Sequence, residues 1–132
     1  MAMQVTSSAT TRKIVNPRVL AQMPVQATWM DAETGEMISA NGMTENVGTT
    51  STLVNLDSLP PVGSGVHLKV LENDDTLLEV DTEVIRVERD PSKPLAALNV
   101  RNHTEEWQER VWTTAQDIAA RAWMSDEDEW IN

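Results

Sequence analysis

Hydrophobic and polar residues alternate along most of the chain, and this period of two predicts β-strands. In the clearest segment, Val25, Ala27 and Trp29 alternate with residues suited to an outer face. Clusters of Gly, Pro, Asn and Asp separate the segments, as turns require. The predicted strands cover residues 24–30, 36–47, 52–56, 66–71, 78–87 and 95–100.

Two of these strands are expected to be irregular. The inward phase changes at Ile85, which predicts a β-bulge near Val84. Gly42 lies inside the second predicted strand, where glycine is typical of a bulge or a bend. The segment Asn73-Asp74-Asp75 is expected to form the turn of a hairpin.

After residue 103 the apolar residues recur at steps of three and four, which predicts one amphipathic helix from Thr104 to about residue 122. Asn102 or Thr104 is the expected N-cap. The apolar stripe is expected to pack on the core. Its three tryptophans are also candidates for an aromatic partner-binding patch. The stripe consists of Trp107, Val111, Trp112, Ala115, Ile118, Ala119 and Ala122, with Trp123 at its end.

Six short strands followed by one helix predict a mainly β fold, a six-stranded antiparallel β-barrel with a C-terminal α-helix. The 132 residues suffice for one domain. Residues 1–17 are expected to form a flexible N-terminal arm that ends at a proline, and residues 124–132 an acidic tail. The folded part is therefore predicted to span residues 18–123.

The charge balance limits the classes of partner. Ten Lys and Arg stand against 21 Asp and Glu, which gives a formal net charge of −11. Such a surface repels phosphate backbones, so nucleic acid is not an expected partner. A small anionic ligand needs a local basic patch. Arg12, Lys13 and Arg18 form the densest basic cluster of the N-terminal half.

The chain has no cysteine, no apolar run near the ~20 residues that span a bilayer, and no signal-peptide pattern. We therefore expect a cytoplasmic protein without membrane insertion. Neither His67 nor His103 has metal-ligand neighbours along the sequence, and no nucleophile motif or paired-carboxylate motif is present. The sequence predicts no catalysis, no metal and no resident cofactor.

Two short motifs resemble the sequence marks of the PilZ domain. Intact PilZ receptors for cyclic di-GMP carry R-x-x-x-R before the first barrel strand and [D/N]-x-S-x-x-G about one hairpin later. Arg18 matches the first arginine, and Asn46 matches the opening residue of the second motif. Residues 60–64 are similar to the family's P-x-x-G loop. Over roughly residues 18–123, the chain therefore resembles a degenerate PilZ domain.

This resemblance implies a non-enzymatic regulatory domain whose arginines would grip the phosphates and guanine faces of cyclic di-GMP. Three motif positions differ here: Gln22 replaces the second arginine, Gly48 the serine and Ser51 the glycine. Glutamine has neither the charge nor the planar fork of arginine. The departures predict weak or absent nucleotide binding, with partial compensation from Arg12 or Lys13.

The resemblance leaves three functions open. The first is a degenerate PilZ-like module that binds a protein partner in bacterial second-messenger signalling. The second is a working cyclic di-GMP receptor with an atypical site built from Arg12, Lys13, Arg18 and Asn46. The third is a regulatory domain related to cellulose-synthase-type glycosyltransferases, because residues 121–130 faintly resemble an R-x-D-x-W ending.

Overall fold

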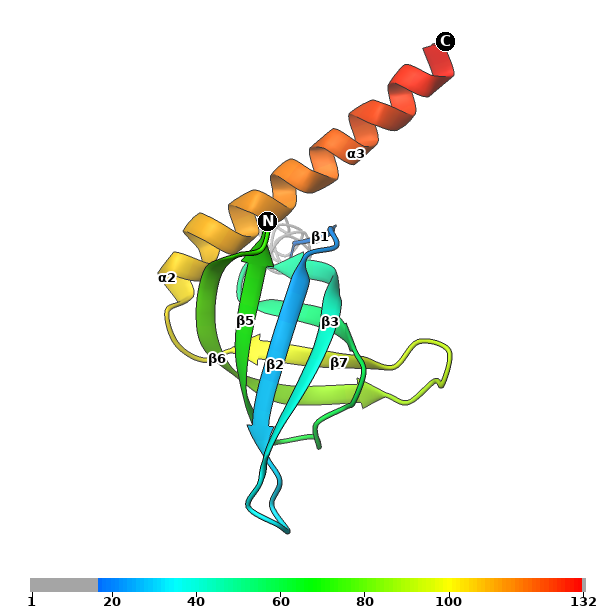
Figure 1. Cartoon of the computed structure of the whole chain (residues 1–132). Helices are drawn as coiled ribbons and strands as arrows, with labels where there is room; N and C mark the ends of the chain where they lie inside the picture. Colours follow the sequence, from blue (N-terminus) through cyan, green and yellow to red (C-terminus); the bar gives the residue numbers. More distant parts are fainter. Residues whose placement is uncertain (1–16, 132) are drawn as a thin grey trace, which may run out of the picture.

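A computed structural model describes the backbone of residues 17–131 and the side-chain surroundings of residues 17–122. A β-barrel carries one long helical segment across one end (Figure 1). None of the described helices is long and apolar enough to cross a membrane. The strands are β1 (Arg18–Leu20), β2 (Pro24–Met30), β3 (Met37–Gly48), β4 (Ser51–Leu56), β5 (Gly65–Glu72), β6 (Asp75–Glu88) and β7 (Leu95–Val100).

All strand pairs are antiparallel, and the hydrogen-bonded order is β1-β3-β2-β5-β6-β7-β4. An additional pairing between β3 and β4 closes the sheet. The predicted six-stranded antiparallel barrel is therefore confirmed. The short strand β1 was not predicted. It pairs with β3 outside the closed ring, so Arg18 opens a strand and does not merely precede one.

The inward face of each strand fills the barrel. Val25, Ala27 and Trp29 are all at most 4% exposed, as the alternation predicted. The same face of the other strands supplies most of the rest of the core: Ala40, Val47, Val54, Leu56, Val66, Leu68, Val70, Val80, Val84, Ala96, Leu98 and Val100.

The bulge predicted near Val84 is confirmed, because the register between β6 and β7 shifts between Val84 and Arg86. Of the bulge or bend predicted at Gly42, the bulge was wrong. The register of β3 shifts between Thr44 and Asn46 instead. Gly42 serves a close approach of two strands, since a Cβ built there would lie 1.8 Å from the carbonyl oxygen of Asn55.

The C-terminal helical segment comprises α2 (Thr104–Glu106), a π-helical turn η1 (Trp107–Trp112) and α3 (Thr113–Ile131). Trp107 and Val111 are fully buried, so this segment caps the barrel. The indole Nε1–H of Trp107 donates to the carbonyl oxygen of Gly48 at 3.0 Å. The predicted packing of the apolar stripe on the core is therefore confirmed at these positions.

Both ends of the helical segment differ from the prediction. His103 occupies the N-cap with left-handed φ of 53°, and no side chain caps the helix. Asn102 instead bonds to Asp81 of β6, so its side chain is not available for a cap. The helix does not end near residue 122 but continues to Ile131. Residues 113–132 contain neither glycine nor proline, the residues that usually stop a helix.

Replacing Trp107 should destabilise the fold strongly. Trp107→Ala removes a fully buried aromatic side chain and is expected to lower the free energy of unfolding by ~3–5 kcal/mol. Trp107→Phe keeps most of the volume but leaves the Gly48 carbonyl without its donor, so we expect a loss of ~1–3 kcal/mol. Urea unfolding of both variants measures their free energies of unfolding, and Trp107→Ala should be the less stable of the two. Wild-type stability in Trp107→Ala would contradict the packing described here.

Glycine at position 42 should be required by the barrel. Gly42→Ala forces its Cβ against the Asn55 carbonyl group, and the two strands must separate. We expect a loss of more than about 2 kcal/mol in thermal or urea unfolding. Gly65→Ala is the matched control, because the nearest atom to its added Cβ lies 3.9 Å away. Equal stabilities of the two variants would show that β3 and β4 are not packed as closely as described.

Candidate functional site

The residues of the second motif lie where β3 passes into β4. Asn46 and Gly48 lie at the end of β3, and Ser51 opens β4 after a short connection. Strand β1 lies beside them, with Arg18 paired to Gly48 in register. Arg18 Nη1 donates to Asn46 Oδ1 at 2.9 Å. The fold therefore joins the matched residues of the two motifs. Arg12 and Lys13 lie outside the described residues.

Arg18 and Ser51 line a surface hollow of ≈ 360 Å³, which we call the Arg18–Arg86 hollow. Its second guanidinium group comes from Arg86 of β6, whose Nη2 lies 3.3 Å from Glu88 Oε2. Among the residues that the structure describes here, the lining includes two arginines and no carboxylate. The full lining is Arg18, Thr50, Ser51, Thr52, Ile85, Arg86, Ala97, Leu98 and Asn99. In a chain of net charge −11, this is a local basic patch.

Gly48 and Ser51 are sterically linked. A Cβ added to Gly48 would lie 3.1 Å from Ser51 Oγ, a close contact. A serine placed at position 48 would therefore bring its side chain against the Ser51 hydroxyl. The chain thus has its serine and glycine in exchanged positions, and the Ser51 hydroxyl lies near the place that a serine hydroxyl at position 48 would need.

Gln22 does not line the Arg18–Arg86 hollow. It follows β1 and lines two other hollows beside α3, of ≈ 490 and ≈ 260 Å³. Ile118 of α3 lines both of these, Glu45 lines the larger and Glu72 the smaller. The structure therefore brings Arg18, Asn46, Gly48 and Ser51 together and places Gln22 apart from them.

The three tryptophans proposed as a partner surface do not share one environment. Trp107 is fully buried in the core. Trp112 is half-buried and packs against that core. The side chain of Trp123 lies outside the described surroundings. Trp107 therefore serves the core.

The sequence reasoning overlooked Arg86 because its role depends on barrel register. The bulge after Val84 leaves both Ile85 and Arg86 exposed, and pairing with β7 brings them beside Ala97 and Leu98. The phase change in the sequence predicted the bulge but placed Ile85 on the inward face, whereas Ile85 is 54% exposed. No sequence signal linked Arg86 to Arg18.

A second polar cluster lies across β5 and β6, where the sequence showed only an isolated histidine. His67 Nε2 lies 2.8 Å from Glu79 Oε1, and its Nδ1 lies 3.0 Å from Asp81 Oδ1. The bond to Glu79, followed by that to Asp81, raises the pKa of His67 above its ordinary 6.5. The same bonds lower the pKa values of both carboxyl groups.

The cluster also anchors the segment before the helix. Asn102 accepts a hydrogen bond from the Asp81 backbone N–H at 2.8 Å, and its amide donates to the Asp81 carboxylate at 2.9 Å.

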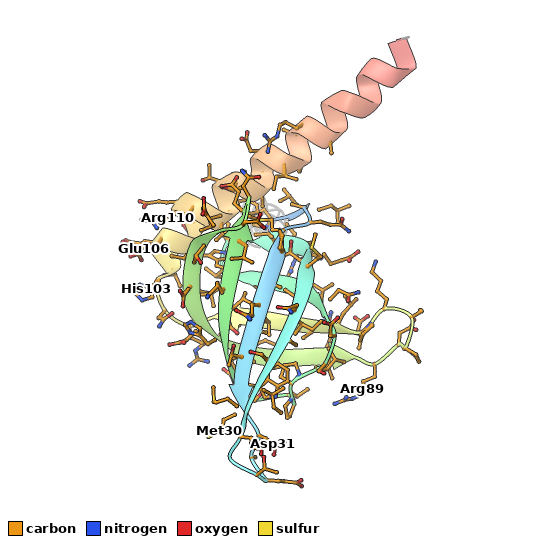
Figure 2. The ribbon with its side chains drawn as sticks, viewed as in Figure 1. Met30, Asp31, Arg89, His103, Glu106 and Arg110 are labelled. Atoms are coloured by element: carbon orange, nitrogen blue, oxygen red, sulfur yellow. The ribbon has the colours of Figure 1, made fainter. Side chains whose placement is uncertain are left out.

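At the start of the helix, His103 Nδ1 lies 3.4 Å from Glu106 Oε1, and both residues are labelled in Figure 2. The described residues contain no group of three or more His, Asp or Glu arranged to hold a metal ion. We interpret the His67 cluster as structural.

The stabilising contribution of His67 should depend on pH. Protonated His67 holds both carboxylates, so its contribution is complete below 6.5 and is lost as pH rises through the raised folded-state pKa. The carboxyl groups act oppositely: their contribution is lost as pH falls through lowered folded-state pKa values. NMR titration should give a His67 midpoint above 6.5. Glu79→Gln should lower that midpoint, and Glu36→Gln, on a distant hairpin, should not. An unshifted midpoint in the wild type would show that His67 does not form these hydrogen bonds to Glu79 and Asp81.

No protein-family model matches the chain, and no curated protein sequence matches it. Among solved structures, the PilZ domain of YcgR from Escherichia coli, determined with c-di-GMP, is similar at a TM-score of 0.61. The two are 13% identical, and the similarity covers 86% of this chain and 96% of that domain.

A structure of the Bacillus subtilis inhibitor of motility MotI/DgrA is also similar, with a TM-score of 0.54 and 20% identity. That match covers 84% of this chain and 51% of the other protein. At these identities the likeness concerns the fold. The chain has the PilZ fold, a closed β-barrel followed by a C-terminal helix, as the resemblance of its motifs predicted.

Proposed function

We propose that the protein is a non-enzymatic PilZ-type regulatory domain that acts through a protein partner and binds cyclic di-GMP weakly or not at all. The observation that carries this proposal is the altered motif on an intact PilZ fold. Gly48 and Ser51 occupy exchanged positions, and Gln22 does not line the hollow that Arg18 lines. The barrel persists while the side chains expected to hold the nucleotide differ.

The missing arginine matters most for affinity. A guanidinium fork gives paired, charge-assisted hydrogen bonds to phosphate, and it stacks on bases. A lost contact of this kind costs about 1.5–3 kcal/mol, or roughly one to two decades of affinity. The exchange of serine and glycine adds a smaller penalty, because Ser51 still presents a hydroxyl close by.

One observation favours a second candidate function, that of a cyclic di-GMP receptor with an atypical site. The Arg18–Arg86 hollow supplies two guanidinium groups and several hydroxyl and amide groups. In this alternative, Arg86 takes the role expected of an arginine at position 22. Arg18 and Arg86 would have to release or share Asn46 and Glu88, their present partners.

Titration calorimetry with cyclic di-GMP tests the proposal. The wild-type chain should show no binding at low micromolar concentration. The triple variant Gln22→Arg, Gly48→Ser, Ser51→Gly should gain roughly two to four decades in affinity. Gly48→Ser is made together with Ser51→Gly because the Ser51 hydroxyl obstructs the added side chain. Ser64→Gly, in a loop outside the motif, is the control.

Three further results decide between the two candidates. The double variant Gly48→Ser, Ser51→Gly shows how much of any gain depends on an arginine at position 22. Micromolar binding by the wild type that is lost in Arg86→Gln would establish the atypical receptor and overturn the degenerate site. A triple variant that folds, as judged by its thermal melt, but does not bind would remove the support for the motif alignment.

A further inference from the structure

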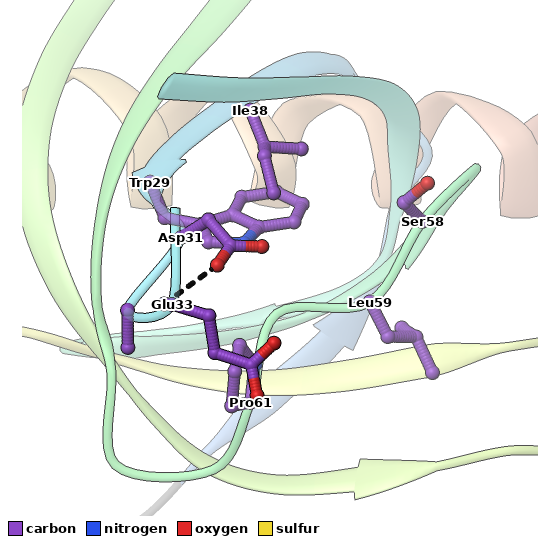
Figure 3. A pocket seen from close by; sticks show the side chains of 8 residues that line it. Trp29, Asp31, Glu33, Ile38, Ser58, Leu59 and Pro61 are labelled. Carbon is purple, nitrogen blue, oxygen red and sulfur yellow. Dashed lines mark hydrogen bonds between the residues drawn. The ribbon is translucent and has the colours of Figure 1, made fainter. Parts of the chain in front are cut away.

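A further hollow lies beside the β2–β3 hairpin, at the end of the barrel away from the helical segment. Met30 and Asp31, labelled in Figure 2, mark this end. The hollow measures ≈ 420 Å³, and Figure 3 shows its side chains. We call it the Trp29 hollow. Its lining is Trp29, Asp31, Ala32, Glu33, Ile38, Ser58, Leu59 and Pro61.

Apolar side chains form much of the Trp29 hollow. Trp29 and Ile38 are paired in register across β2 and β3, so both lie on the same face of the hairpin. Leu59 and Pro61 come from the connection between β4 and β5. An indole beside three aliphatic groups provides a surface for an apolar side chain or for the stem of a long basic one.

The hollow also contains an unused hydrogen-bond donor. Trp29 is only 4% exposed, and no acceptor among the described residues bonds to its indole N–H. Within that part of the chain, no fully buried side-chain nitrogen or oxygen lacks a partner. The indole nitrogen therefore keeps some accessible surface, and Trp29 lines the hollow. A buried indole usually bonds to an acceptor, so this donor is positioned for one supplied by a ligand.

Two carboxylates complete the site. Asp31 Oδ1 accepts the backbone N–H groups of Glu33 at 2.8 Å and of Thr34 at 3.1 Å, which fixes the direction of its carboxylate. The first of these bonds is the dashed line in Figure 3. Glu33 forms no ion pair with a described residue, and the described lining contains no Lys or Arg. The hollow therefore carries two negative charges that no cation of the described residues pairs with.

We propose that the Trp29 hollow binds an arginine or lysine side chain on an apolar segment of a partner protein. Such a segment matches all three features at once. Its cation pairs with Asp31 and Glu33, a backbone carbonyl accepts the Trp29 N–H, and an apolar neighbour packs on Ile38 and Leu59. The inference rests on the proposed regulatory function, whose partner surface it identifies, and it is independent of the Arg18–Arg86 hollow.

Side chains around the hollow enlarge the surface that this segment would contact. Met30 and Met37 are paired at the end of the same hairpin and are 60% and 61% exposed. Val62, next to Pro61, is 58% exposed. Methionines adapt their shape to a partner and are frequent on protein-binding surfaces. The carboxylates of Asp31 and Glu33 disfavour a nucleic acid as the partner and favour a basic protein.

A short peptide probe tests the site on the full chain. The acetylated and amidated tetrapeptide Leu-Arg-Leu-Ile is titrated at low salt while the indole N–H signal of Trp29 is followed by NMR. We expect a saturable shift of that signal. The same peptide with citrulline in place of arginine keeps the shape without the charge, and it should bind at least about fivefold more weakly.

Two isosteric changes remove the charges without disturbing the turn. In the variant Asp31→Asn, Glu33→Gln, the amide oxygen at position 31 still accepts the turn hydrogen bonds. This variant should lose about fivefold or more in affinity for the arginine peptide, whereas Glu36→Gln, on the same hairpin but outside the hollow, should stay within about twofold.

Three results would each overturn the proposal. They are an unmoved Trp29 signal, equal affinity for the citrulline and arginine peptides, or a loss of affinity in Glu36→Gln as large as that in the double variant. The proposed function fails separately, because the cyclic di-GMP titration concerns different residues. Expected peptide binding together with micromolar nucleotide binding would keep the Trp29 hollow and reject only the degenerate site.

Discussion

The hydrogen bond from the Trp107 indole to the Gly48 carbonyl joins the two parts of the molecule. One partner is the first buried side chain of the helical segment, and the other is the last residue of β3, inside the altered motif. The indole is fully buried, so the bond is protected from water and sets where the segment crosses the barrel end. This hydrogen bond therefore links the β3–β4 connection directly to the helical segment.

The barrel and its inward faces could be predicted from sequence because they follow from local periodicity. Features that depend on strand register could not. His67 is isolated along the chain, and only the β5–β6 pairing brings Glu79 and Asp81 to it. Arg86 likewise joins Arg18 through the closure of the barrel. The helix end was misjudged for another reason: an acidic run suggested a tail, but nothing in it breaks a helix.

Two of the hollows, the Arg18–Arg86 hollow and the Trp29 hollow, carry opposite charge. The Arg18–Arg86 hollow offers cations without a lining carboxylate, and the Trp29 hollow offers carboxylates without a lining cation among the described residues. One suits an anion and the other a basic segment, so the two ligands would not compete for the same contacts. Within a strongly acidic chain, the basic hollow is the more unusual of the two.

The pairing of β4 with β7 has a consequence for folding kinetics. It joins Ser51 to Asn99, so this pair closes a loop that contains all of β5 and β6. Most other neighbouring strands are joined by shorter connections and can pair locally. Pairing β4 with β7 closes a long loop, which costs more conformational entropy and slows folding. Because Trp107 docks on Gly48, close to the start of β4, the helical segment gains its binding surface late. The chain is therefore expected to fold slowly for its length, with closure of the ring as the limiting event.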